Sequence, residues 1–141
     1  MPDAPVPPAP PAPHSVALTL PAQRICAGSD LAEKGRAVVF DVLHFRELAR
    51  AFALRFDGRV VAYLNRCAHV PTELDWQPGE FLDAGREFII CAVHGASYSA
   101  ESGRCIGGPC GQGRLLPIVA FERDGGVWWQ PTRDTRPAFT D

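Results

Sequence analysis

The amino-acid sequence predicts an all-β fold built from antiparallel sheets. Turn-forming glycine and proline residues recur at short intervals, and most segments between them are rich in apolar and β-branched residues. Asp57-Gly58 and Asp124-Gly125 each separate two such segments, and Asp-Gly is typical of the two-residue turn of a β-hairpin. The chain has 141 residues, of which 46% are hydrophobic, so it is long enough for one domain with a substantial core.

The expected strands follow from these patterns in chain order. Residues 45–52 have a short helical pattern, and residues 31–35 could form a helical turn after the cap Ser29-Asp30. Residues 88–91 and 59–64 are of special interest because each leads directly toward a Cys-His pair. The predicted strands are 16–20, 37–43, 53–56, 59–64, 88–91, 117–123 and 127–129.

The terminal segments and the net charge of the chain exclude several classes of protein. Residues 1–14 are rich in proline and alanine and predict a disordered tail, and residues 15–141 predict a single domain. The tail lacks the basic and apolar regions of a secretory signal, so we expect a cytoplasmic protein. A formal net charge of −2 without a basic cluster argues against nucleic-acid binding. The longest apolar stretch, residues 37–45, is too short to span a membrane.

Two short motifs carry the chemistry. They are Cys67-Ala68-His69 and, after 21 residues, Cys91-Ala92-Val93-His94. Two thiolates and two imidazoles in this order fit a [2Fe–2S] cluster in which the cysteines bind one iron and the histidines bind the other. A structural zinc site is the main alternative, but zinc fingers usually pair cysteine with cysteine and histidine with histidine at short spacing.

The residues around both pairs resemble a Rieske domain over residues 25–130. The resemblance rests on Asn65-Arg66 before the first pair, on the stretch from Gly95 to Tyr98 after the second, and on Ser102-Gly103 followed by Gly107-Gly108-Pro109. It implies a Rieske-like fold with a small cluster-binding subdomain, about residues 65–112, formed by two ligand loops and a Gly-Pro loop.

The resemblance also implies a role for each matching residue. Cys67 and Cys91 would bind the inner iron of one Rieske-type [2Fe–2S] cluster, and His69 and His94 the outer iron. Gly95 would let the backbone turn closely past the cluster, and Pro109 belongs to a loop that would cover it from a third side. Tyr98 matches a hydroxyl donor to the cluster or to thiolate sulfur.

The chain departs from respiratory Rieske proteins at three positions. Those proteins have a disulfide between the ligand loops, and its cysteines correspond here to Thr72 and Val93. They also have a serine donor where this chain has Ala96. Hydrogen bonds to sulfur raise the potential, so we expect a value in the lower half of the Rieske range of about −150 to +300 mV.

The chain has three further cysteines. Cys26 lies in an apolar context and is expected to be a small buried residue. Cys105 and Cys110 flank the Gly-Pro loop and could be free thiols, a disulfide or a redox-sensitive pair; in a reducing cytosol we expect free thiols. Trp76 and Phe81, in the stretch between the ligand pairs, are expected to pack locally.

The resemblance implies an electron carrier of the soluble Rieske ferredoxin kind. It would pass single electrons between a flavoprotein reductase and an oxygenase or similar acceptor, with no catalytic site of its own. We do not expect a terminal oxygenase, because the sequence after the Rieske region is too short to supply the two-histidine, one-carboxylate iron site. An accessory subunit of a reductase or oxygenase complex and a zinc-stabilised β interaction domain are the alternatives. Glu73 and Asp75 could steer a basic partner or could be ordinary solvated charges.

Overall fold

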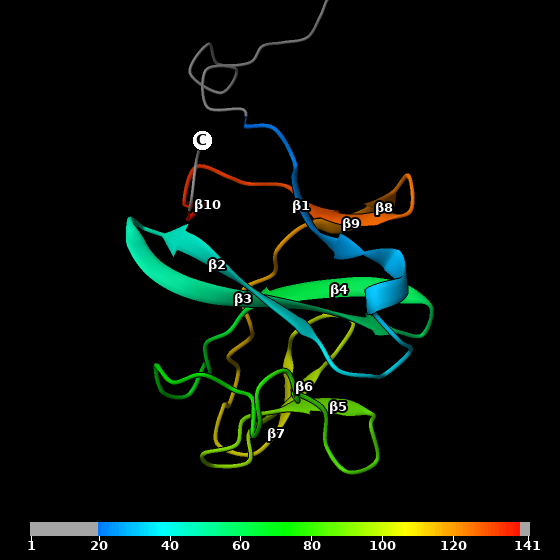
Figure 1. Cartoon of the computed structure of the whole chain (residues 1–141). Coiled ribbons are helices and arrows are strands. Elements are labelled where there is room, and N and C mark those ends of the chain that lie inside the picture. Colours follow the sequence, from blue (N-terminus) through cyan, green and yellow to red (C-terminus); the bar gives the residue numbers. More distant parts are fainter. Residues whose placement is uncertain (1–19, 139–141) are drawn as a thin grey trace, which may run out of the picture.

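The computed structural model describes residues 20–138 and consists almost entirely of β-strands (Figure 1). One short 3₁₀ helix, η1 (Gly28–Asp30), follows the first strand. The strands are β1 (Gln23–Ala27), β2 (Val38–His44), β3 (Glu47–Phe56), β4 (Arg59–Leu64), β5 (Phe88–Ile90), β6 (Ser97–Ser99), β7 (Cys105–Gly107), β8 (Ala120–Arg123), β9 (Gly126–Trp129) and β10 (Thr135–Pro137).

The strands form three antiparallel sheets. The largest has the order β10-β2-β3-β4, and the other two have the orders β1-β9-β8 and β5-β6-β7. In Figure 1 the β5-β6-β7 sheet lies on one side of the β2-β3-β4 strands and the β1-β9-β8 sheet on the other. The middle of the large sheet, at residues 51–54 of β3, is therefore buried on both faces.

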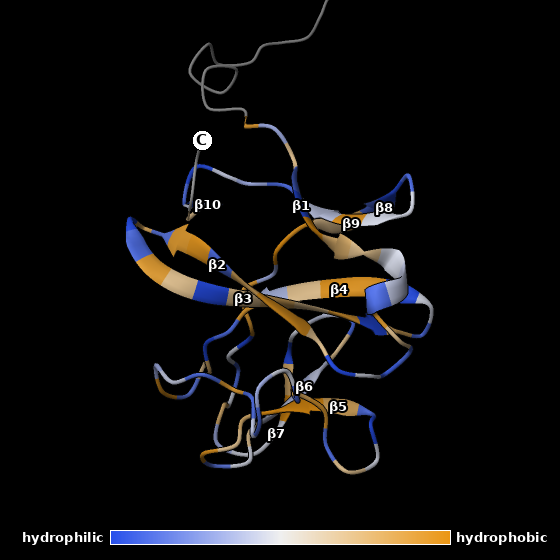
Figure 2. Ribbon diagram, viewed as in Figure 1, coloured by the Kyte–Doolittle hydropathy of each residue, from blue (hydrophilic) through white to orange (hydrophobic). Residues whose placement is uncertain are grey.

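The side chains of β3 show how one strand serves both faces. Phe52 and Leu54 point into the core shared with the β5-β6-β7 side, whereas Ala51 and Ala53 point into the core shared with β1 and β9. Successive residues of a strand point to opposite faces, so this division follows from the period of two. Figure 2 shows apolar colours along β4 and β5 and hydrophilic colours in most connecting loops.

The prediction of an all-β antiparallel fold is confirmed, and both Asp-Gly hairpins form where expected. β3 and β4 join at Asp57-Gly58, and β8 and β9 join at Asp124-Gly125. The helix predicted from the pattern of residues 45–52 was wrong, because residues from 47 onward belong to β3. Pairing with β2 and burial between two cores outweigh the local helix propensity of this segment.

Four other expectations concern the helical turn, the strand at 16–20, the tail and Cys26. The short helical turn lies at η1, before the expected residues 31–35. The predicted strand at 16–20 and the predicted tail at 1–14 fall almost wholly outside the described residues. Cys26 is buried in β1, as predicted.

Within residues 20–138, no helix has the length and apolar character needed to cross a membrane.

Candidate metal centre

Each Cys-His pair lies in a loop that begins where a strand ends. β4 ends at Leu64, three residues before Cys67, and β5 ends at Ile90, directly before Cys91. Cys67 and Cys91 are 4% and 1% exposed, whereas His69 and His94 are exposed. The two imidazole rings lie edge to face with their centroids 5.1 Å apart. The loops therefore bring all four predicted ligands together, with the sulfurs inside and the rings outside.

The two buried thiols interact with each other and with backbone amides. Burial alone would raise the pKa of Cys67, but hydrogen bonds from the Tyr98 hydroxyl and from the amides of Val70 and His69 hold the pKa below its ordinary value. Burial raises the pKa of Cys91, and the amides of Val93 and His94 act in the opposite direction. In both loops, then, the amides two and three residues after the cysteine donate to its sulfur.

The amide arrangement has a chemical consequence. A thiolate in an apolar core is stabilised only when donors or metal ions compensate its charge. Each cysteine sulfur here has such donors from its own loop. The donors outweigh burial at Cys67, whose pKa is lowered, but not at Cys91, whose pKa stays raised by burial.

Tyr98 connects strand β6 to the first ligand loop. Its hydroxyl lies 3.3 Å from the Cys67 sulfur and accepts a hydrogen bond of 3.0 Å from the Ala68 amide. Tyr98 is fully buried, and burial raises the pKa of its hydroxyl. The hydroxyl therefore stays protonated at neutral pH and can donate to the Cys67 sulfur.

We predict that Tyr98→Phe lowers the reduction potential. A hydrogen bond to sulfur stabilises the reduced, more negative state, and losing about 1 kcal/mol of that preference corresponds to roughly 40 mV for one electron. Tyr63→Phe is the matched control, because the Tyr63 hydroxyl is also buried but donates to the Ala100 carbonyl. Equal potentials for Tyr98→Phe and the wild type in a redox titration would contradict this role.

A third loop covers the two ligand loops. A Cβ at Gly108 would lie 2.9 Å from the Gly95 carbonyl, and a Cβ at Gly113 would lie 2.8 Å from the Ala68 Cβ. The third loop therefore packs against both ligand loops, and only glycine permits the close approach at these points. Pro109, between these glycines, is exposed.

Gly95 follows the second ligand histidine and has a φ of +75°. This left-handed conformation favours glycine, and no protein atom lies within 4 Å of the position of a Cβ. The turn of the backbone that the sequence predicted is present. A close approach to the cofactor at Gly95 stays a prediction.

Cys105 and Cys110 form a disulfide, so the expectation of free thiols was wrong. That expectation came from the redox state of the cytosol, which says nothing about geometry. The turn at residues 107–110 brings the two Cα atoms to 5.8 Å, within the usual range for a disulfide. The bond closes the base of the third loop.

Asn65 anchors the first ligand loop, and sequence analysis assigned it no role. Its side-chain oxygen accepts a 2.8 Å hydrogen bond from the Leu74 amide, and its side-chain nitrogen donates to Asp75. The residue is 5% exposed, one of two buried polar residues in the described core. A polar residue at the inner end of an apolar strand was the available signal, because a buried amide must find partners.

The stretch between the ligand pairs also packs against the core. Phe81 is buried and stacks on Phe52 of β3 with ring centroids 3.8 Å apart, so it packs into the main core rather than locally. Trp76 remains 45% exposed, although its indole nitrogen donates to the Leu82 carbonyl. For Trp76, then, local packing is only partial.

The donor set fits two metal atoms better than one. Structural zinc needs four ligands around one ion. No group of three or more His, Cys, Asp or Glu side chains among residues 20–138 is arranged to hold a single ion. A [2Fe–2S] cluster of the mixed type takes two protein ligands on each iron. Cys67 and Cys91 would hold one iron, and His69 and His94 the other.

Comparison with solved structures shows the same fold in known proteins. The ferredoxin of carbazole 1,9a-dioxygenase from Nocardioides aromaticivorans IC177 is 18% identical, with a TM-score of 0.61 over 79% of this chain and 98% of that chain. The terminal oxygenase from the same organism is 19% identical, with a TM-score of 0.65, over 86% of this chain but only 33% of its own. No match is found among curated proteins.

The family comparison agrees with the ligand geometry. The model of the Rieske [2Fe-2S] domain matches residues 22–134, which include both ligand pairs and the third loop. Proteins with this domain carry a Rieske-type [2Fe–2S] cluster, and the donor set described above fits that cofactor. The chain belongs to the Rieske [2Fe-2S] domain family.

Proposed function

We propose that this protein is a one-electron carrier between a reductase and an oxygenase or similar acceptor. The observation that carries the proposal is the arrangement of the ligands: buried Cys67 and Cys91 behind exposed His69 and His94. The cluster, when bound, takes up and releases one electron. Exposed imidazole edges shorten the path to a docked partner, whereas the protein around the cysteines keeps water from the sulfurs.

The structural relatives support the same proposal. A ferredoxin and its oxygenase are present together in one solved complex, whose matching chain is 19% identical with a TM-score of 0.60 over 77% of this chain and 92% of that chain. This chain covers nearly the whole of the ferredoxins but only about a third of the oxygenases it matches. The ferredoxins, which this chain covers almost completely, therefore support the carrier role.

The cytoplasmic location expected from the sequence stays a prediction. The Cys105–Cys110 bond provides a test, because disulfides rarely persist in a reducing cytosol. Thiol alkylation of the protein inside intact cells, followed by mass spectrometry, would show whether the bond exists there.

A potentiometric titration tests the proposed function. We expect a one-electron Nernst curve with a midpoint in the lower half of the Rieske range of about −150 to +300 mV. The physical reason is the loss of one hydrogen-bond donor at Ala96, while Tyr98 still reaches sulfur. A midpoint near the top of the range would contradict the ferredoxin role and would favour oxidation of a quinol-type donor.

A further inference from the structure

Three hairpins of this fold have two-residue turns with positive φ at both positions. Asp57-Gly58 and Asp124-Gly125 occupy two of them, with φ of 52° and 79° and of 53° and 75°. Asp-Gly suits this turn because both residues tolerate positive φ. The third turn, between β2 and β3, is Phe45-Arg46 with φ of 49° and 70°. Bulky residues are disfavoured in this conformation.

Neither side chain of the Phe45-Arg46 turn is needed for the core. Phe45 is 65% exposed, and Leu48 on β3 beside the turn is 68% exposed. The β10 segment holds the turn in place: the Phe45 amide donates to the Asp134 carbonyl at 2.8 Å, and the His44 ring and the Thr135 hydroxyl share a hydrogen bond of 2.8 Å. Strain of this kind concentrates at functional sites when neighbouring structure enforces it.

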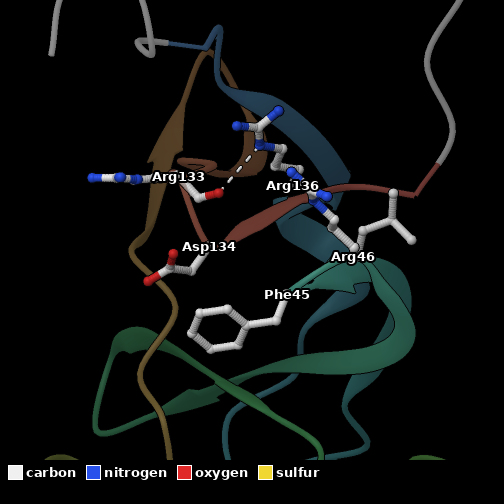
Figure 3. A pocket seen from close by; sticks show the side chains of 6 residues that line it. Phe45, Arg46, Arg133, Asp134 and Arg136 are labelled. Carbon is white, nitrogen blue, oxygen red and sulfur yellow. Dashed lines mark hydrogen bonds between the residues drawn. The ribbon is translucent and has the colours of Figure 1, made fainter. Parts of the chain in front are cut away.

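The turn borders a cavity of about 360 Å³, here called the arginine cavity (Figure 3). Phe45 and Arg46 come from the turn, Arg133 and Asp134 come from the segment leading into β10, and Arg136 comes from β10 itself. Its lining consists of Leu43, Phe45, Arg46, Arg133, Asp134 and Arg136. None of its three arginines forms an ion pair with a carboxylate of residues 20–138. Figure 3 shows the Arg133 guanidinium directed away from those of Arg46 and Arg136, and the Arg136 Nε donates to the Arg133 carbonyl at 3.2 Å. The lining thus contains three arginines and one carboxylate.

The acidic side chains beside the first ligand loop already accept hydrogen bonds from other groups of the protein. Glu73 accepts two hydrogen bonds of 2.9 Å from the Arg50 guanidinium. Asp75 accepts from the Asn65 side chain and the Gly79 amide. These carboxylates, which the sequence offered as a means of steering a basic partner, are used within the protein.

The arginine cavity and the first ligand loop are electrostatically connected. Arg66 lines a shallow pocket together with Leu48 and Ala49 of β3, so it lies close to the β3 side of the turn. Arg66 is exposed and directly precedes Cys67. Glu47, at the start of β3, and Asp41, on β2, are exposed carboxylates of the same sheet. The surface from the cavity to the ligand loop therefore carries more positive than negative charge.

We propose that the arginine cavity is a docking site for an acidic segment of the protein's redox partner. This inference rests on the proposed function. Guanidinium groups bind carboxylates in a two-pronged geometry, and exposed arginine together with an aromatic side chain is the composition enriched at protein interfaces. Phe45 supplies apolar contact area, and the three arginines supply charge complementarity. A partner that docks here and reaches past Arg66 lies beside the ligand loop.

Calorimetric titration of the full-length holoprotein with an acetylated hexaglutamate peptide at low ionic strength tests the proposal. We expect binding that weakens as salt is added. Arg46→Gln combined with Arg136→Gln should weaken it about fivefold, from two lost charge pairs. Arg59→Gln is the matched control, because Arg59 is an exposed arginine that begins β4 and pairs with Phe56 at the opposite end of β3. It should leave the affinity unchanged.

A second variant separates the docking role from folding. Phe45→Asn with Arg46→Gly gives the turn a preferred Asn-Gly sequence, and we expect the melting temperature to rise by about 3 °C while peptide binding weakens. A stabilised variant that has lost binding shows that the natural turn is kept for the contact. An unchanged or lower melting temperature would contradict the strain on which the inference depends.

The other possible outcomes of the titration also test the docking site. No peptide binding by the wild type, or equal losses in Arg59→Gln and the double arginine variant, would overturn the docking site. Full competition by inorganic phosphate at equal concentration would identify a site for small anions and would overturn docking by a protein segment. The one-electron titration is run on the same samples: its failure with peptide binding intact would contradict the proposed function alone.

Discussion

Cys67→Ser is expected to abolish the iron–sulfur cluster. Cys67 is buried and would supply one of only two thiolates on its iron, and a serine hydroxyl is not ionised at neutral pH. The amides and the Tyr98 hydroxyl that now donate to sulfur would face a neutral oxygen. The wild type should contain about two irons per chain and a red-brown chromophore. The variant should lose both, as measured by iron analysis and visible absorption.

Cys26→Ser is the matched control for this experiment. Cys26 is also a buried cysteine without a disulfide, but it lies in β1, within the other core. Its replacement should leave the iron content and the spectrum of the purified protein unchanged. A Cys67→Ser protein that keeps a wild-type spectrum would show that the thiolate of this loop is not a ligand.

Replacing Cys105 and Cys110 with alanine is expected to destabilise the protein by about 2 kcal/mol, because the disulfide removes conformational freedom from the unfolded chain even over a short loop. This loss corresponds to a fall of roughly 8 °C in melting temperature. The bond closes the base of the loop that packs against Gly95 and Ala68, so the cluster should also be lost faster on heating. Circular dichroism and visible absorption during a thermal ramp measure the two effects.

A chemical reductant provides the control for the disulfide. Wild-type protein treated with a phosphine reductant should melt at the temperature of the double alanine variant, and the reductant should not change the variant itself. Equal melting temperatures for the untreated wild type and the variant would show that the bond contributes nothing to stability. A mass spectrum of alkylated protein reports how much of the bond is present in each sample.

Sequence alone predicted the features that depend on local chemistry. Asp57-Gly58 and Asp124-Gly125 marked hairpins because few other dipeptides adopt two positive φ angles at low cost. The two Cys-His pairs identified the family because the ligand type fixes the metal chemistry. The four ligand positions stay predictions, and the structure supports them by bringing the side chains together.

Features that depend on distant contacts could not be predicted. The helical pattern at residues 45–52 gave way to β3 because two cores and a neighbouring strand act on that segment. The Cys105–Cys110 bond and the anchoring role of Asn65 depend on how loops fold back, which spacing does not encode. The Phe45-Arg46 turn could not be predicted either, because the β10 segment that holds it in place lies more than eighty residues later in the sequence.

The central claim is that two cysteines bind one iron and two histidines bind the other. Electron paramagnetic resonance of the reduced protein, with ¹⁵N-labelled histidine and pulsed detection of nitrogen couplings, tests it most directly. We predict a rhombic signal at low average g with couplings from two histidine nitrogens, both lost when His69 and His94 are replaced by alanine. A reduced cluster without histidine nitrogen coupling, or a colourless protein that contains zinc, would contradict the account.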